Sequence, residues 1–182
     1  FVVRSVKKMV PKYHLPNAVT FGHALAEGRK FSLKPHTGTH DDVIALQYTG
    51  GTTGVSKGAM LTNRNLVANM LQIKATMDPF LKEGKEIAIC PLPLYHIFAF
   101  TVNCLAIVNY GSLSVLITNP RDMDSVIKTI KAYPFSMITG VNTLFNALLN
   151  HKDISTVDFS NLRVTCGGGM AVQKPVAEKW QD

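Results

Sequence analysis

Residues 48–59 read Tyr48-Thr49-Gly50-Gly51-Thr52-Thr53-Gly54-Val55-Ser56-Lys57-Gly58-Ala59, shortly after the apolar run Val43-Ile44-Ala45-Leu46. The stretch combines four glycines, four threonine or serine hydroxyls and a single lysine. Glycine lets the backbone turn sharply and bring N–H groups close to an anion. Hydroxyls donate hydrogen bonds to phosphate oxygens, and lysine adds a mobile positive charge. The composition therefore predicts a loop that holds a polyphosphate.

The spacing of this stretch excludes two common nucleotide-binding motifs. A Walker A loop requires Gly-x-x-x-x-Gly-Lys-[Ser/Thr], but Ser56 precedes the lysine and Gly58 follows it. The dinucleotide motif Gly-x-Gly-x-x-Gly also fails, because Gly50, Gly51 and Gly54 have different offsets. The stretch therefore belongs to another kind of phosphate loop, or is only a glycine-rich turn.

After residue 43 the chain alternates between short apolar runs and longer amphipathic segments. Helices are expected from an N-cap at Thr62, from Ile97, over Met123–Ile130, around Leu144–Leu149 and near Val172. Strands are expected over Val43–Gln47, Glu86–Cys90, Leu113–Ile117, Phe135–Thr139 and Leu162–Cys166. Such alternation predicts an α/β fold with a mostly parallel sheet covered by helices on both faces.

The unusual sequences of the chain follow these predicted strands. The glycine-rich stretch comes after the first strand, and Pro93-Leu94-Tyr95-His96-Ile97-Phe98 comes after the second. Thr139–Thr143 follows the fourth strand, and Gly167-Gly168-Gly169-Met170 follows the fifth. Because open α/β sheets bind ligands at the carboxyl ends of their strands, these segments are expected to share one rim.

Composition is that of a reduced globular protein. The chain has 182 residues, 46% of them hydrophobic, enough for the core of an ordinary domain. No apolar stretch reaches the roughly 18 residues of a membrane span, and the longest, Ile97–Val108, is expected to form a buried helix. Cys90, Cys104 and Cys166 lie in apolar surroundings, and no signal peptide is recognised, so a cytoplasmic location is expected.

Positive charge is concentrated in the first 40 residues, which carry +6 of the formal net charge of +7. The basic residues there are Arg4, Lys7, Lys8, Lys12, Arg29, Lys30 and Lys34, against the single acid Glu27. Val2, Val3, Val6, Met9 and Val10 recur at helical spacing, which predicts a basic amphipathic helix. Such a helix suits an anionic membrane surface or, the favoured reading, another part of a longer protein. With Pro11–His40 as a connecting segment, the chain divides into residues 1–40 and an α/β nucleotide-binding subdomain, residues 41–182.

The motifs together resemble one family. Residues 48–58 are similar to the Tyr-Thr-Ser-Gly-Thr-Thr-Gly-x-Pro-Lys-Gly signature of the adenylate-forming enzymes, with Gly50 and Ser56 at the usual serine and proline positions. Within this family the chain is closest to bacterial long-chain fatty-acyl-CoA synthetases. Five further segments carry that likeness: Pro93–Phe98, Gly140–Asn150, Gly167–Gln173, Lys12–Pro16 and Ile117–Asp122.

The resemblance implies a two-step reaction, in which ATP activates a long-chain fatty acid and coenzyme A then displaces AMP. It implies that Thr49, Thr52 and Thr53, with the backbone of Gly50, Gly51 and Gly54, bind the β- and γ-phosphates. Lys57 would neutralise pyrophosphate, Tyr48 would brace the loop and His96 would orient the carboxylate. Gly167, Gly168 and Gly169 would pass close to the adenylate. Phe98, Phe100 and Leu144 are candidate walls of an acyl channel.

Several parts of the family pattern lie outside residues 1–182. The family's Tyr-Gly-x-Thr-Glu motif with its Mg²⁺ ligand, its ribose-binding aspartate and its C-terminal domain are not found in this sequence, so no metal ligand is assigned here. The chain also starts at Phe1 and stops at Asp182 inside a predicted helix. We therefore expect it to be an internal piece of the N-terminal domain, inactive by itself. A nucleic-acid partner is not expected, whereas peripheral contact with the inner face of a membrane and a homodimer are left open.

Three other functions stay open on the residues alone. One is a P-loop-like NTPase, disfavoured by Ser56 and Gly58. Another is a non-catalytic nucleotide-binding module. The third is a different adenylate-forming ligase; a peptide-synthetase adenylation domain is disfavoured because the candidate loops hold no acid for an amino group.

Overall fold

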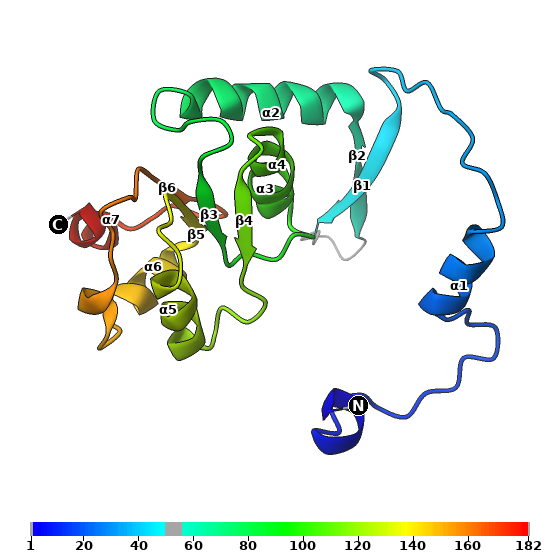
Figure 1. Ribbon diagram of the computed structural model, residues 1–182, viewed down its shortest axis with the longest axis horizontal. Coiled ribbons are helices and arrows are strands. Elements are labelled where there is room, and N and C mark those ends of the chain that lie inside the picture. Colours follow the sequence, from blue (N-terminus) through cyan, green and yellow to red (C-terminus); the bar gives the residue numbers. More distant parts are fainter. Residues whose placement is uncertain (1, 50–55, 182) are drawn as a thin grey trace. The chain divides into compact units, whose positions relative to one another are not determined.

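The centre of the fold is a four-stranded parallel sheet, seen in the computed structural model of the chain (Figure 1). The structure describes residues 2–49 and 56–181, without the side chains of Val2 and Thr49. The strands run in the order β4-β3-β5-β6, and all neighbours are parallel. Their bounds are β3 Ile87–Cys90, β4 Leu113–Leu116, β5 Met137–Gly140 and β6 Val164–Gly167. Four of the five strands predicted for a parallel sheet are therefore confirmed.

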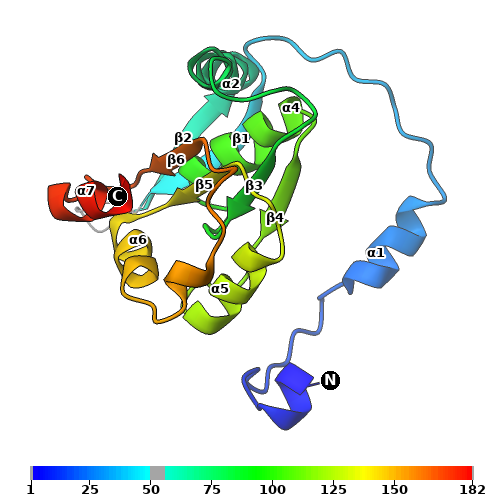
Figure 2. The same ribbon diagram turned by 60° about the vertical axis from the view of Figure 1, so that its left-hand side comes forward.

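Helices cover both faces of this sheet (Figure 2), as the alternation predicts. Ile89 and Ile138 lie in one apolar cluster with residues of α5, α6 and α7. Ala88, Cys90 and Met137 lie in a second cluster with residues of α2 and of the helix after β3. All five strand residues are at most 1% exposed. The bounds of these helices are α2 Asn63–Met77, α5 Met123–Lys131, α6 Asn142–Leu149 and α7 Lys174–Gln181, with a short 3₁₀ turn at Ile154–Thr156.

The apolar stretch after β3 forms a buried helix, also as predicted. It begins as α3 Ile97–Ala99, widens into a π-helical segment over Phe100–Ala106 and ends as α4 Ile107–Asn109. Ala99, Val102, Ala106 and Ile107 are at most 5% exposed. Long π-helical segments are rare in proteins.

Helix α2 is capped at its start and joined to α4 by a polar network at its end. Its predicted N-cap is confirmed, because the Thr62 hydroxyl accepts a hydrogen bond from the Asn65 N–H and Asn65 Oδ1 accepts from the Thr62 N–H. At its other end the buried Tyr110 hydroxyl donates to Asp78 Oδ1 at 2.6 Å. Lys74 Nζ lies 2.9 Å from the same carboxylate and 4.6 Å from the centre of the Tyr110 ring. This network joins α2 to α4.

The first predicted strand does not belong to the parallel sheet. It forms β1 Val43–Thr49, which pairs antiparallel with β2 Lys57–Thr62 in a separate two-stranded sheet. Strand β2 was not predicted, because Lys57–Thr62 is mostly exposed and shows no alternation of apolar and polar residues. The prediction that the glycine-rich stretch follows a strand of the parallel sheet is therefore wrong; it connects the two strands of a hairpin.

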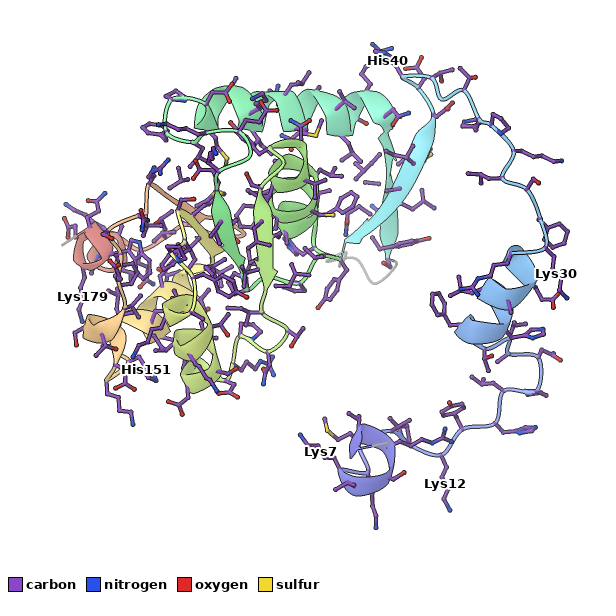
Figure 3. The ribbon with its side chains drawn as sticks, in the orientation of Figure 1. Lys7, Lys12, Lys30, His40, His151 and Lys179 are labelled. Atoms are coloured by element: carbon purple, nitrogen blue, oxygen red, sulfur yellow. The ribbon has the colours of Figure 1, made fainter. Side chains whose placement is uncertain are left out.

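The chain divides into two compact units, one ending at Gly38 and the other starting at Thr39. In the first, the predicted basic helix is limited to a single π-helical turn, Val2–Val6, which ends before Met9 and Val10. The prediction of a connecting segment over Pro11–His40 is also wrong in part. Helix α1 Phe21–Gly28 forms there, and its N-cap Thr20 accepts a hydrogen bond from the His23 N–H. Figure 3 shows Lys7, Lys12 and Lys30 along this unit.

Among the helices of the described residues, none combines the length and apolar character that crossing a bilayer requires.

Candidate functional site

The loops after β3, β5 and β6 lie at one rim of the parallel sheet, as predicted from the strand order. Gly140, the last residue of β5, pairs in register with Gly167 of β6. The Gly140 carbonyl then accepts a hydrogen bond from the Gly168 N–H at 3.1 Å, just beyond the paired strands. This bond holds the glycine loop against the end of β5.

The glycine loop is shaped by close packing within the chain. A Cβ on Gly167 would lie 2.5 Å from Val172 Cγ2, and one on Gly168 would lie 3.0 Å from the Phe98 ring. Gly169 has φ +78°, a left-handed conformation that favours glycine. The Phe98 contact joins the loop after β3 to the loop after β6. Whether the backbone of this loop also approaches an adenylate remains a prediction.

His96 lies at the start of α3, at the same rim. Its Nδ1 accepts a hydrogen bond from the Phe98 N–H at 3.3 Å, so this ring is the N-cap of the helix. A nitrogen that accepts a hydrogen bond carries no proton, which leaves the proton of the neutral ring on Nε2. The side chain is exposed. His96 can therefore present an N–H donor outward while its other nitrogen fixes the ring.

The β1–β2 hairpin meets this rim through Gln47. Its Nε2 donates a hydrogen bond of 3.4 Å to the carbonyl of Tyr95, which is the residue before His96. This contact was not predicted from the sequence. A half-buried amide near the end of a strand gives no pattern by which it could have been found.

Within the hairpin the structure places part of the predicted phosphate loop. Tyr48 pairs with Gly58, and a Cβ on Gly58 would lie 3.2 Å from the Tyr48 ring. That Tyr48 braces the phosphate loop stays a prediction. Thr49 and Lys57 are paired in register at the end of the ladder where the chain connects the two strands, and Lys57 is exposed. Gly50, Gly51, Thr52, Thr53 and Gly54 lie outside the described residues.

Apolar hollows lie at this rim within the described part of the chain. One of about 440 Å³ lies at the ends of β3 and β4, between Cys90–Tyr95 and Leu116–Pro120. A smaller one of about 190 Å³ is lined in part by Pro91, Met123 and Leu144. Of the three predicted channel walls, Leu144 lines a hollow, whereas Phe98 packs against Gly168.

Beneath the rim lies a buried polar cluster that the sequence analysis missed. Asn103 Nδ2 donates to Thr139 Oγ1 at 2.8 Å, and both side chains are at most 1% exposed. The Ser114 hydroxyl lies 3.1 Å from Cys90 Sγ and donates to the Asn103 carbonyl. Burial raises the pKa of the Cys90 thiol and of the Cys166 thiol, so neither is an activated nucleophile. The one feature of the sequence that could have indicated this buried polar cluster was a single asparagine within the apolar run 97–108.

The described residues include one group of three side chains of the metal-ligand type, Asp124, His151 and Asp153. His151 Nδ1 accepts from the Asp153 N–H at 3.2 Å, and Nε2 lies 3.1 Å from Asp124 Oδ1. Both ring nitrogens are therefore engaged within the chain. His151 and Asp153 follow the C-terminal end of α6, whereas Asp124 lies in the first turn of α5.

Comparisons with known proteins agree on one family. The sequence profile described as AMP-binding enzyme matches residues 5–182. The long-chain-fatty-acid–CoA ligase of Salmonella typhimurium strain LT2 is 55% identical over 181 residues, which cover 99% of this chain and 32% of that protein. The enzyme of the same name from Haemophilus influenzae is 51% identical over 185 residues, covering 100% and 33%.

A solved structure shows the same fold. The fatty acyl-adenylate ligase from L. pneumophila, in complex with acyl adenylate and pyrophosphate, matches with a TM-score of 0.77 at 20% identity. The match covers 96% of this chain and 31% of that one. The chain thus spans about a third of the length of the curated relatives it matches.

Proposed function

Because the chain belongs to the family of AMP-binding enzymes, we propose that it is the part of a long-chain-fatty-acid–CoA ligase that holds ATP phosphates and orients the fatty carboxylate. A carboxylate oxygen attacks the α-phosphorus of ATP, the bond to the bridging oxygen breaks, and pyrophosphate leaves. The thiolate of coenzyme A then attacks the acyl carbon, and AMP leaves. Both substrates are anions, so the first step requires preorganised N–H and cationic groups.

The junction between the hairpin and the His96 loop carries this proposal. The hydrogen bond from Gln47 to the Tyr95 carbonyl holds the end of the hairpin beside the loop that presents His96. One element offers hydroxyls, glycine N–H groups and Lys57 to phosphate, and the other offers an imidazole to a carboxylate. An arrangement of this kind brings an acid and a polyphosphate together for in-line attack.

Each predicted site residue has a role in the proposal. Thr49, Lys57 and the glycine-rich stretch bind the β- and γ-phosphates, with Lys57 on the departing pyrophosphate. His96 Nε2–H donates to the carboxylate while Nδ1 stays bonded to the Phe98 N–H. The loop of Gly167, Gly168 and Gly169 lies along the adenylate, and the apolar hollow after β3 receives part of the acyl chain.

Mg²⁺ is proposed to accompany ATP. None of the site residues named above carries a carboxylate, so these residues do not form a site for the ion.

The first unit is the proposed place of any membrane contact. It holds Lys7, Lys8 and Lys12 together with exposed apolar side chains such as Val6, Met9 and Leu15. In a cytoplasmic protein this combination suits the anionic inner face of a membrane. Cosedimentation of the full-length protein with phosphatidylglycerol vesicles should be weakened in Lys7→Glu/Lys8→Glu. If the substitutions leave cosedimentation unchanged, the unit docks on protein instead. A homodimer stays open.

The proposed function is tested by isotope exchange between ATP and pyrophosphate in the full-length protein that carries this chain. Exchange should require a long-chain fatty acid, and His96→Ala should lower it by about tenfold or more while thiolysis of supplied acyl-adenylate stays within about threefold. His23→Ala, in α1, is the matched control and should stay within about twofold.

Three results would contradict the proposal. Hydrolysis of ATP to ADP without fatty acid would favour an NTPase. ATP binding without exchange would favour a non-catalytic module. Equal loss of adenylation and thiolysis in His96→Ala would make this residue structural.

A further inference from the structure

We propose that Asn103 and Thr139 are a positioning pair for the adenylation step, which fixes the rim loops from beneath; this inference rests on the proposed function. The two side chains exchange hydrogen bonds. Asn103 Nδ2 lies 2.8 Å from Thr139 Oγ1, and Thr139 Oγ1 lies 3.2 Å from Asn103 Oδ1. Asn103 is 1% exposed and Thr139 is fully buried. Neither side chain can contact a substrate directly.

The pair links the two elements that carry the rim. Asn103 lies in the π-helical segment of the helix that His96 caps, and the same helix holds Phe98 against Gly168. Thr139 immediately precedes Gly140, whose carbonyl receives the Gly168 N–H. One buried contact therefore sets the helix that presents His96 relative to the strand that holds the glycine loop.

Further hydrogen bonds connect the Asn103–Thr139 pair to other strands of the sheet. Ser114 of β4 donates to the Asn103 carbonyl at 3.2 Å. The same hydroxyl lies 3.1 Å from Sγ of Cys90, the last residue of β3. Asn103 thus connects the helix to β5 directly and to β4 and β3 through Ser114. If the helix slid along the sheet, several buried polar groups would lose their partners, which is costly. An apolar contact would resist such a slide much less.

Stability alone does not require this pair. Replacing both partners of a buried hydrogen bond by apolar groups of similar shape is often nearly neutral, whereas removing one partner leaves an unsatisfied group. A small displacement of reacting groups, by contrast, can lower a rate by about 10²-fold. The pair is therefore expected to matter more for the rate of adenylation than for folding.

The test uses the full-length protein and the double variant Asn103→Leu/Thr139→Val. Its melting temperature should stay within about 4 °C of wild type. The kcat of fatty-acid-dependent pyrophosphate exchange should fall about 10- to 100-fold, with KM for ATP within about twofold. Thiolysis of supplied acyl-adenylate should change less than exchange does. Ser136→Ala is the matched control, since this buried serine lies at the other end of β5 and accepts from the Ile87 N–H; its kcat should stay within about twofold.

A second comparison covers the case in which the double variant does not fold. Thr139→Ser keeps the hydroxyl, so its exchange rate should be within about threefold of wild type, whereas Thr139→Val should lose tenfold or more. Equal rates in these two variants, or a wild-type kcat in the folded double variant, would overturn the positioning role. If wild type itself shows no exchange, the proposed function fails instead, which distinguishes the two failures.

Discussion

The two halves of the candidate site are built differently. In the parallel sheet, Ala88, Ile89 and Ile138 are fully buried, and the loops at its rim rest on this core. In the hairpin, Leu46 is 56% exposed, Tyr48 61% and Met60 69%. The rim loops are therefore fixed by packing, whereas the hairpin depends on its own ladder and on a few contacts with the rest of the chain.

This difference predicts how substitutions in each half should affect folding stability and activity. Changes that create a clash or leave one buried polar group unpaired at the rim should alter folding stability and activity together, because the same contacts serve both. The double variant Asn103→Leu/Thr139→Val, which removes both partners of a bond, is the expected exception. Changes in the hairpin should alter activity with little effect on stability, because its side chains bury little surface. The variants below test this separation.

The largest effect is expected at the end of the hairpin. Thr49→Ala should lower fatty-acid-dependent adenylation by roughly 10²-fold or more, as for loss of a preorganised donor at developing charge. The free energy of unfolding should change by less than about 0.5 kcal/mol. Lys57→Ala should act in the same direction but less steeply. Exchange kinetics and urea unfolding of the full-length variants measure both effects, and exchange within twofold of wild type for Thr49→Ala would remove the phosphate role.

The next-largest effect is a difference in folding stability between a substitution at the rim and a matched substitution in the hairpin. A Cβ on the buried Gly140 would lie 2.7 Å from Phe145 Cζ and 3.0 Å from Leu144 Cδ2, so Gly140→Ala should destabilise by about 1–3 kcal/mol. Gly58→Ala in the hairpin is the matched control. Its Cβ would meet only the exposed Tyr48 ring, so its cost should stay within about 0.5 kcal/mol. Equal losses in urea unfolding would show that the hairpin is as tightly packed as the rim.

A smaller effect is expected where α2 joins the hairpin region to the sheet. Burial, followed by the hydrogen bond to Asp78, raises the pKa of Tyr110 well above its ordinary value near 10. The neutral phenol is thus favoured in the folded state, so its stabilisation is complete below pH 10 and declines as the pH rises above that value. Tyr110→Phe should reduce stability at neutral pH and flatten its decline between about pH 10 and 11. An unchanged slope of stability against pH would mean that the pKa of Tyr110 is not raised in the folded state.

The smallest effect concerns the junction itself. Gln47→Ala removes two long, exposed hydrogen bonds of 3.4 Å, to the Tyr95 and Tyr48 carbonyls, so adenylation should fall only about two- to fivefold, without loss of stability. Gln47→Glu should match it, because a carboxylate cannot donate to the Tyr95 carbonyl. Wild-type exchange in both variants would show that the hairpin and the His96 loop act independently.

The parallel half of the fold could be predicted because each strand is a short apolar run ended by proline or glycine. The run Ile87–Cys90 stops at Pro91, and Met123, Val126, Ile127 and Ile130 mark α5 by spacing alone. The same rules could not predict the pairing of β1, since its partner β2 is an exposed segment without alternation. Helix α1 was not predicted because residues 11–40 show little apolar periodicity, although Thr20 caps the helix.

The site was predictable where a motif is contiguous and unpredictable where it depends on distant pairing. His96 and the glycine loop were found from local sequence, and the structure places them on the same rim. The Asn103–Thr139 pair joins residues 36 positions apart, and Gln47 reaches Tyr95 across 48. Periodicity describes one element at a time, so it carries no information about which side chains meet.

The most direct test of the account is the fate of the carboxylate oxygen. The full-length protein would be given a long-chain fatty acid labelled with ¹⁸O in both carboxylate positions, together with ATP, Mg²⁺ and coenzyme A, and the products would be analysed by mass spectrometry. If the carboxylate attacks the α-phosphorus, thiolysis leaves one ¹⁸O atom in AMP and one in the acyl-CoA. Label in ADP or inorganic phosphate, or unlabelled AMP alongside acyl-CoA, would contradict activation through an acyl-adenylate.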